Sequence, residues 1–493
     1  PYPKHQSLRV RANAPDISTK KIATSSLWLT ASFGFAKISQ LISQIFLARL
    51  LSPEDFGVWG MVLIVTTLSA LFKDAAIASV LVQRGLNDRK LVNAVYSLGV
   101  NISIVMFIIQ ALAGFPLAQF FGEPQVFPLT LTVAFVFIIG AGAGSHGAVL
   151  QRQMKFRELA ITDSCAGFAR FGGAVACASL GGGVWCFAIA EIAMSLVDAL
   201  FKRYFSGYRF QYYFKPDKQA IREVRAYISS LVGINLAVYA NTNADNLIVG
   251  RLIGAQSLGY YNLAYQLAML PTFALSQINR VNFSVMSQRD NDGRKIYLCR
   301  MLEIYAVLYA GIYGVGFIVA PWIIPLVYGE QWIPAVSIFQ IVMIFAYARG
   351  FMSILGTALN AIDKPNINAV INWVLVPLSI PAFFVGANWG GVTGVAIAVA
   401  LVMGVGASIW FWLAVSRAAK WNIMELLKPV ILPTLTITIA LVVVINIPLS
   451  ASLQTFLQPL LVIAIYAIGL SVFSGGRIPK LLINVVKRSL NKA

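Results

Sequence analysis

Two copies of one short motif decide the fold of this chain. They are Ala48-Arg-Leu-Leu-Ser-Pro-Glu-Asp-Phe-Gly-Val-Trp59 and Gly250-Arg-Leu-Ile-Gly-Ala-Gln-Ser-Leu-Gly-Tyr-Tyr261. The copies align without a gap as small-Arg-Leu-aliphatic, four variable residues, then apolar-Gly-apolar-aromatic. Each copy links two apolar runs. Because the Arg and Gly positions match in register, we interpret the pair as an internal repeat.

The composition around these motifs is that of a protein whose solvent is lipid. Of 493 residues, 58% are hydrophobic and 12% are charged, and the mean hydropathy is +0.75. A soluble domain needs about 25% charged residues to cover its surface. The net charge of +19 is distributed in short clusters between apolar runs, as in the loops of membrane proteins, so we expect no nucleic-acid partner.

Apolar windows long enough to cross a bilayer number about fourteen. They fall at 25–47, 56–82, 92–115, 126–150, 159–180, 184–205, 226–248, 258–286, 297–328, 335–362, 366–387, 391–415, 427–447 and 455–473. The sequence therefore predicts an all-α integral membrane protein. Twelve spans would be the alternative even number.

The orientation follows from the basic residues. The two tails and the loops 84–90, 152–157, 202–225, 289–300, 364 and 417–428 hold roughly thirty Lys and Arg. The opposite loops hold only Arg49 and Arg251. This asymmetry predicts that both termini are cytoplasmic, and that the polar first residues form a cytoplasmic tail before an uncleaved first span.

Six spans separate the two motif copies, so both copies have the same orientation in the membrane. That is a parallel repeat, whose lobes are related by an axis along the membrane normal. We expect a cytoplasmic tail (1–22), an N-lobe with six spans (23–215), a C-lobe with six spans (216–420), two further spans (421–475) and a second basic tail (476–493).

Charged side chains within the spans are costly and need a reason. The basic ones are Lys37, Lys73, Arg170, Arg280 and Arg349. We interpret them as the lining of a water-filled cleft that binds a phosphate-bearing head group, since guanidinium and ammonium groups suit phosphate. The alternative is that they form ion pairs that only hold helices together, and Arg280 alone could simply extend to the cytoplasmic interface.

Acidic residues in the spans have two interpretations. Asp74 and Asp245 are candidates for coupling to H+ or Na+, although pairing with Lys73 or another span would look the same in the sequence. Asn241 and Asp245 share a helical face. Asp163 and Arg170, seven residues apart, are the pair that we expect to be structural.

Several classes of chemistry are disfavoured by what the sequence lacks. Four cysteines without a CxxC spacing and two histidines give no metal site. There is no Gly-Lys dipeptide, hence no P-loop, and we expect no cofactor. A membrane polysaccharide polymerase or ligase would need a sizeable outer loop with catalytic residues, and every outer loop is short, so we expect no enzyme.

Several stretches resemble the Wzx-type polysaccharide exporters of the multidrug/oligosaccharidyl-lipid/polysaccharide (MOP) superfamily, in particular the colanic-acid and teichuronic-acid branch. They are the first motif copy, 150–160 (LQRQMKFRELA), 244–254 (ADNLIVGRLIG) with 260–265 (YYNLAY), 329–335 (GEQWIPA) and the turn 363–365 (DKP). One departure is Ala76, where the family usually has Gly two residues after the Asp.

The resemblance implies a flippase in a bacterial inner membrane. It would move an undecaprenyl-pyrophosphate-linked oligosaccharide to the outer leaflet by alternating access, for lipopolysaccharide or exopolysaccharide export. Membrane lipids, a coupling H+ or Na+ and the polysaccharide polymerase machinery are the other partners that it suggests. The alternative within the same fold is an ion-coupled multidrug antiporter, which should line its cleft with carboxylates and aromatic rings.

Overall fold

The computed structural model describes residues 41–84, 86–217, 219, 222, 236, 239–448 and 451–478. Within these ranges all regular structure is helical. Besides the helical segments 41–50 and 239–252, the order is α2 (Pro53–Arg84), α3 (Arg89–Phe121), α4 (Val126–Ile139), α5 (Ala143–Arg152), α6 (Phe156–Ser179), α7 (Trp185–Ser206), α9 (Ala255–Ser276), α10 (Asn279–Ser287), α11 (Asn291–Tyr328), a 3-10 turn (Glu330–Trp332), α12 (Pro334–Ala361), α13 (Pro365–Ala398), a π-helical stretch (Val399–Gly406), α14 (Ala407–Ala419), α15 (Ile423–Ile445) and α16 (Ala451–Phe473).

The predicted all-helical membrane protein is confirmed. Seven described helical stretches are long and apolar enough to cross a membrane, and the bent pair α4–α5 makes eight. One of the seven, Pro365–Ala419, contains two expected spans, 366–387 and 391–415. Its backbone leaves helical geometry at Gly390 and Gly391, where the second of them begins. The expected span 25–47 lies largely outside the described residues, as does about half of the expected span 226–248.

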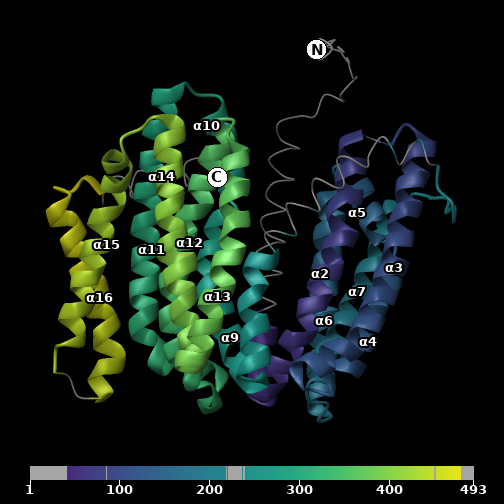
Figure 1. Cartoon of the computed structure of the whole chain (residues 1–493), viewed down its shortest axis with the longest axis horizontal. Helices are drawn as coiled ribbons and strands as arrows, with labels where there is room; N and C mark the ends of the chain where they lie inside the picture. The colour runs from purple at the N-terminus through teal and green to yellow at the C-terminus, as the bar shows by residue number, and fades with distance from the viewer. Residues whose placement is uncertain are drawn as a thin grey trace.

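The helices form two lobes and an appendage (Figure 1). We call the segment 41–50 with α2–α7 the N-lobe, and the segment 239–252 with α9–α14 the C-lobe; they meet where α2 packs on α9. Helices α15 and α16 pack against α11 on the far side of the C-lobe. There the Tyr466 hydroxyl donates a hydrogen bond to the Val307 carbonyl at 3.0 Å, within a separate apolar cluster.

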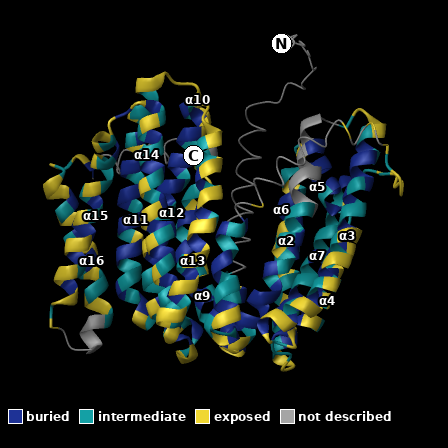
Figure 2. Cartoon of the chain, viewed as in Figure 1, coloured by how far each residue is buried: buried dark blue, intermediate teal, exposed yellow. Residues whose placement is uncertain are grey.

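Exposed residues lie along the outer helices of both lobes (Figure 2), and many of them are large and apolar. On α3 they include Ile108, Leu112 and Phe115, and on α13 Trp373 and Leu378. Contiguous apolar surface on this scale marks contact with lipid rather than water. The burial pattern thus agrees with the composition.

The fourth expected span, 126–150, is broken where it borders the site described next. Helices α4 and α5 meet at a bend of 43°. Gly142 in the break has φ of 77°, and a Cβ there would lie 2.6 Å from the Tyr96 ring. Only glycine fits this turn, because its conformation and the neighbouring ring both exclude a side chain.

Candidate functional site

A cavity of about 730 Å³ lies inside the N-lobe, a size typical of ligand pockets. Helices α2 to α7 and Ser43 of the segment 41–50 line it. Much of the wall is small, since four glycines of the α4–α5 region contribute: Gly140, Gly142, Gly144 and Gly147. The bend between α4 and α5 therefore opens space that a straight helix with larger side chains would fill.

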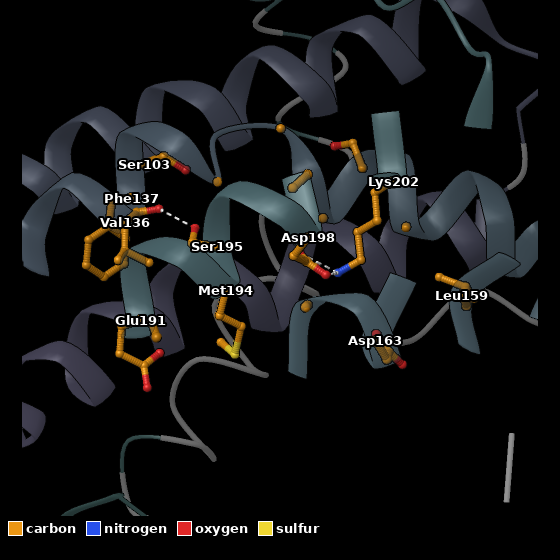
Figure 3. Close-up of a pocket in the computed structure, with 18 of the residues that line it drawn as sticks. Ser103, Val136, Phe137, Leu159, Asp163, Glu191, Met194, Ser195, Asp198 and Lys202 are labelled. Carbon is orange, nitrogen blue, oxygen red and sulfur yellow. Dashed lines mark hydrogen bonds and ion pairs between the residues drawn. The ribbon is translucent and has the colours of Figure 1, made fainter. Parts of the chain in front are cut away.

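Two ion pairs lie in the wall of this cavity. The Arg170 Nη2 atom on α6 is 2.6 Å from the Glu191 Oε1 atom on α7. One helical turn apart on α7, the Lys202 Nζ atom is 2.7 Å from an oxygen of Asp198 (Figure 3). Asp163 also lines the cavity, and it forms no ion pair with a described side chain.

The expected pair of Asp163 with Arg170 is wrong. The seven-residue spacing did put both side chains on the cavity face of α6, but the guanidinium pairs with Glu191 of the next helix. Lys202, which the sequence placed among the basic residues of a cytoplasmic loop, is on the penultimate turn of α7 and reaches the cavity. Its i, i+4 spacing from Asp198 was the available signal.

The described charges of the cavity do not form a cationic surface. Three carboxylates and two basic groups line it, and each basic group has a carboxylate within ion-pair distance. The lining also carries hydroxyl and amide groups: Ser43, Thr66, Ser103, Ser145, Gln151 and Ser195. Such a wall can hydrogen-bond a neutral polar group, because paired charges keep free donors and acceptors while their fields largely cancel.

The other predicted basic residues are not seen to share this cavity. Lys37 lies outside the described residues, and the side chains of Lys73 on α2 and Arg280 on α10 are not described, nor is that of Asp74. Arg349 is half-buried on α12 in the C-lobe, close enough to Tyr265 for an electrostatic interaction. Arg170 and Arg349 therefore stand in different lobes.

Asp245 is the most buried described carboxylate of the C-lobe, with 3% of its surface exposed. It accepts a hydrogen bond from the Tyr261 hydroxyl at 2.6 Å and one from the backbone N–H of Asn246 at 2.9 Å. No described cation is within ion-pair distance of it. One turn earlier Asn241 donates to the Asn372 carbonyl of α13, and its own buried oxygen has no partner among the residues described.

The two motif copies meet each other at the junction of the lobes. A Cβ on Gly57 would lie 1.7 Å from the Ala255 carbonyl oxygen, and a Cβ on Gly259 would lie 1.8 Å from the Pro53 carbonyl oxygen. In the repeat alignment Gly57 corresponds to Gly259, and Pro53 to Ala255. The two contacts are therefore the same contact made twice, once in each direction, and the backbones touch with no side chain between them.

The motif arginines also cross between the lobes. Arg49 donates from Nε to the Val327 carbonyl at 2.8 Å and also bonds the Leu326 carbonyl, at the C-terminal end of α11, where carbonyls lack helical partners and the dipole favours a cation. Arg251 lies over the Phe120 ring at 5.6 Å, at the corresponding end of α3.

A second pair of similar stretches, which we did not identify from the sequence, lies at the two helix ends that these arginines contact. The stretches 120–123 (FFGE) and 327–330 (VYGE) close α3 and α11 with the same Gly-Glu pair. The C-lobe copy continues into Gln331 and Trp332, whose side chains donate to the Ala48 carbonyl at 2.7 and 2.8 Å. The lobes are thus joined firmly at the motif end of the molecule.

Fold and site together define a multi-spanning helical membrane protein with two repeat-related lobes. The model of the family described as "Polysaccharide biosynthesis protein" matches residues 46–337, more than half of the chain, and the chain belongs to that family. The resemblance to the Wzx-type exporters is confirmed.

Known relatives and solved structures agree with this membership. The chain is 24% identical over 420 residues to the lipopolysaccharide biosynthesis protein WzxC of Escherichia coli K12, covering 82% of this chain and 84% of that protein. It is 22% identical to the teichuronic acid biosynthesis protein TuaB of Bacillus subtilis 168, with 85% and 87% covered.

Among solved structures, the lipid II flippase MurJ in an inward closed conformation superposes with a TM-score of 0.74 at 16% identity, over 91% of this chain and 98% of that one. An inward-facing multidrug resistance MATE transporter of the MOP superfamily gives 0.62 at 15% identity, over 78% and 96%. These likenesses show the MOP fold.

Proposed function

We propose that this protein flips an anionic lipid-linked oligosaccharide, with an undecaprenyl-pyrophosphate carrier, from the cytoplasmic to the outer leaflet for surface polysaccharide biosynthesis. The observation that carries the proposal is the arrangement of the lobes: repeat-related backbones are in contact at one end, and a polar cavity lies within the N-lobe. Two lobes sealed at one side are one half of an alternating-access cycle. The family and the relatives named for polysaccharide synthesis support the cargo.

The membrane orientation is part of this proposal. The basic loops 84–90, 152–157 and 289–300 would face the cytoplasm with both termini, and the sealed motif end would face outward. The chain would then lie in a bacterial inner membrane and would receive its cargo from the cytoplasmic side. It would carry out no covalent chemistry.

We further propose that the sugars occupy the N-lobe cavity and that the pyrophosphate is bound elsewhere. The described lining has one carboxylate more than it has cations, so it suits hydroxyl-rich sugar and would repel a free pyrophosphate. Arg349, which has no described carboxylate within ion-pair distance, and the candidates Lys37, Lys73 and Arg280 would provide the phosphate contacts. The lipid tail would remain in the bilayer.

Ion coupling would fall to Asp245 in this scheme. A free charge buried this deeply is costly, so binding of a proton or a cation would stabilise the carboxylate. The unpartnered oxygen of Asn241 one turn away and the Tyr261 hydroxyl are further polar groups beside it. Asp74 remains a second candidate.

A multidrug antiporter is the second candidate function, favoured by one observation: the carboxylate excess in the N-lobe cavity. One experiment separates the two. The purified protein is reconstituted in vesicles with an undecaprenyl-pyrophosphate-linked oligosaccharide, and the sugar becomes accessible to an impermeant glycosidase if it is flipped. Uptake of a cationic dye by the same vesicles, without sugar translocation, would instead identify an antiporter.

A further inference from the structure

An extended strap follows α7 and runs alongside α3 at the outer edge of the N-lobe (Figure 1). Helix α7 ends at Ser206, and Gly207 with φ of 57° turns the chain away. We use the word strap for residues 207–215, Gly-Tyr-Arg-Phe-Gln-Tyr-Tyr-Phe-Lys. It belongs to the connection between the two lobes.

A row of polar side chains on α3 binds the backbone of the strap. The row consists of Asn93, Ser97 and Asn101, spaced by four residues and therefore on one helical face. The backbone N–H of Gln211 donates to the Asn93 side-chain oxygen at 3.2 Å, and the backbone N–H of Tyr213 donates to the Ser97 hydroxyl at 3.0 Å.

The end of the strap near Lys215 is hydrogen-bonded to the same polar row on α3. The Asn101 amide group donates to the Phe214 carbonyl at 3.1 Å, and the Tyr212 hydroxyl donates to Asn101 at 2.8 Å. At the upper end the Phe210 ring stacks on Tyr96 at 4.5 Å. An otherwise irregular segment is thus held in a defined place on the lobe.

The depth of the strap in the membrane follows from the face of α3 that binds it. Beyond Asn101 the same face becomes apolar and exposed, beginning with Ile104 and Val105 and continuing to Leu112 and Phe115. From 104 to the end of the helix near 120, the rise is about 25 Å, close to the roughly 30 Å of a hydrocarbon core. The strap therefore lies where hydrocarbon gives way to the head-group layer.

The exposed side chains of the strap and of the end of α7 are of the kinds found at a membrane–water interface, aromatic and basic. Tyr204 at the end of α7 and Phe214 are 80% and 77% exposed, and aromatic rings favour the head-group level. Arg203, Arg209 and Lys215 are exposed and have no described carboxylate within ion-pair distance.

We propose that the strap binds the head groups of anionic phospholipids at the cytoplasmic surface of the bilayer. Its cations would pair with lipid phosphates, its rings would lie among the head groups, and the polar row on α3 would hold it at that depth. The lobe connection would then be tied to the membrane plane beside the N-lobe. This inference does not depend on the transported substrate.

Hydrogen–deuterium exchange of the full chain in nanodiscs tests the proposal. One set of nanodiscs contains phosphatidylcholine alone, and the other contains about 30% phosphatidylglycerol. We expect amide exchange over 207–215 to be about tenfold slower with phosphatidylglycerol, and the difference to shrink in 0.5 M NaCl because salt screens exposed charge.

Two variants separate lipid binding from mere packing. The double substitution Arg209→Gln/Lys215→Gln should abolish the lipid dependence while leaving the hydrogen bonds to α3 intact. Arg289→Gln, which removes an exposed cation stacked on Tyr297 in the C-lobe, should leave the dependence unchanged. Equal exchange of the native strap in both lipids would overturn the proposal and leave the strap as a cover for α3.

Discussion

Gly57 touches the backbone of Ala255 so closely that a Cβ would lie 1.7 Å from its carbonyl oxygen, and the repeat-related Gly259 touches Pro53 in the same way. The contact joins α2 and α9 near the N-terminal end of each helix. In an alternating-access cycle both contacts would have to separate together when the motif end opens. The repeat thus has a physical consequence: one pair of identical contacts can close the two lobes symmetrically.

Gly57→Ala and Gly259→Ala should both destabilise this closed junction. The added methyl group overlaps backbone atoms, which cannot rotate away as a flexible side chain would, and overpacking of this kind costs about 1–3 kcal/mol. Sugar translocation in vesicles and the thermal midpoint of unfolding are the two measurements. Gly172→Ala on α6, where a Cβ meets no atom within 4 Å, is the matched control. Wild-type translocation in both interface variants would contradict the role of the contact.

The junction could be anticipated from the sequence only in part. The motif copies predicted two lobes, and the helices do form two groups (Figure 1); the parallel relation of the lobes in the membrane stays a prediction. Pattern alone could not show that the copies touch each other, because the contact joins residues about two hundred positions apart. Arg49 and Arg251 were used only to assign the outer side, whereas each crosses to the helix end of the opposite lobe.

The candidate site was predictable to a similar extent. Helical periodicity put Asp163 and Arg170 on one face, but the partner of the guanidinium is Glu191 on another helix, and such pairing depends on how α6 and α7 pack. The expectation of a shared cationic cleft treated all buried cations alike. For Arg170 an ion pair accounts for the charge, and for Arg349 in the C-lobe phosphate binding remains a prediction.

Arg170→Gln should destabilise the N-lobe more than the double variant Arg170→Gln/Glu191→Gln. The single substitution leaves Glu191, whose side chain is 17% exposed, without its cation. A mostly buried charged group that loses its hydrogen-bond partner costs about 2 kcal/mol of stability. The double substitution replaces both charges with amides that can bond each other. Unfolding midpoints of the purified variants give the comparison, and equal destabilisation by both would show that an unpaired Glu191 carries no extra cost.

Neutralising the phosphate candidates should separate cargo binding from folding. Lys37→Gln, Arg280→Gln and Arg349→Gln together are expected to abolish sugar translocation and to leave membrane insertion intact. Arg349→Gln alone should weaken inhibition of translocation by free pyrophosphate, while Asp163→Asn should not. Undiminished transport by the triple variant would refute a role for cations in binding the carrier phosphates.

Asp245→Asn should uncouple transport from its ion gradient without unfolding the C-lobe. The amide keeps the shape of the carboxyl group and can still accept the hydrogen bond from Tyr261, but it cannot bind a proton and holds a cation far less strongly. Translocation is measured in vesicles with an imposed H+ or Na+ gradient and again without one. The native protein should respond to one of the gradients and the variant to neither.

Tyr261→Phe, which removes the donor and keeps the carboxylate, should retain the response with an altered ion dependence. A variant at 245 that still follows the gradient would move the coupling site elsewhere, with Asp74 the next residue to substitute.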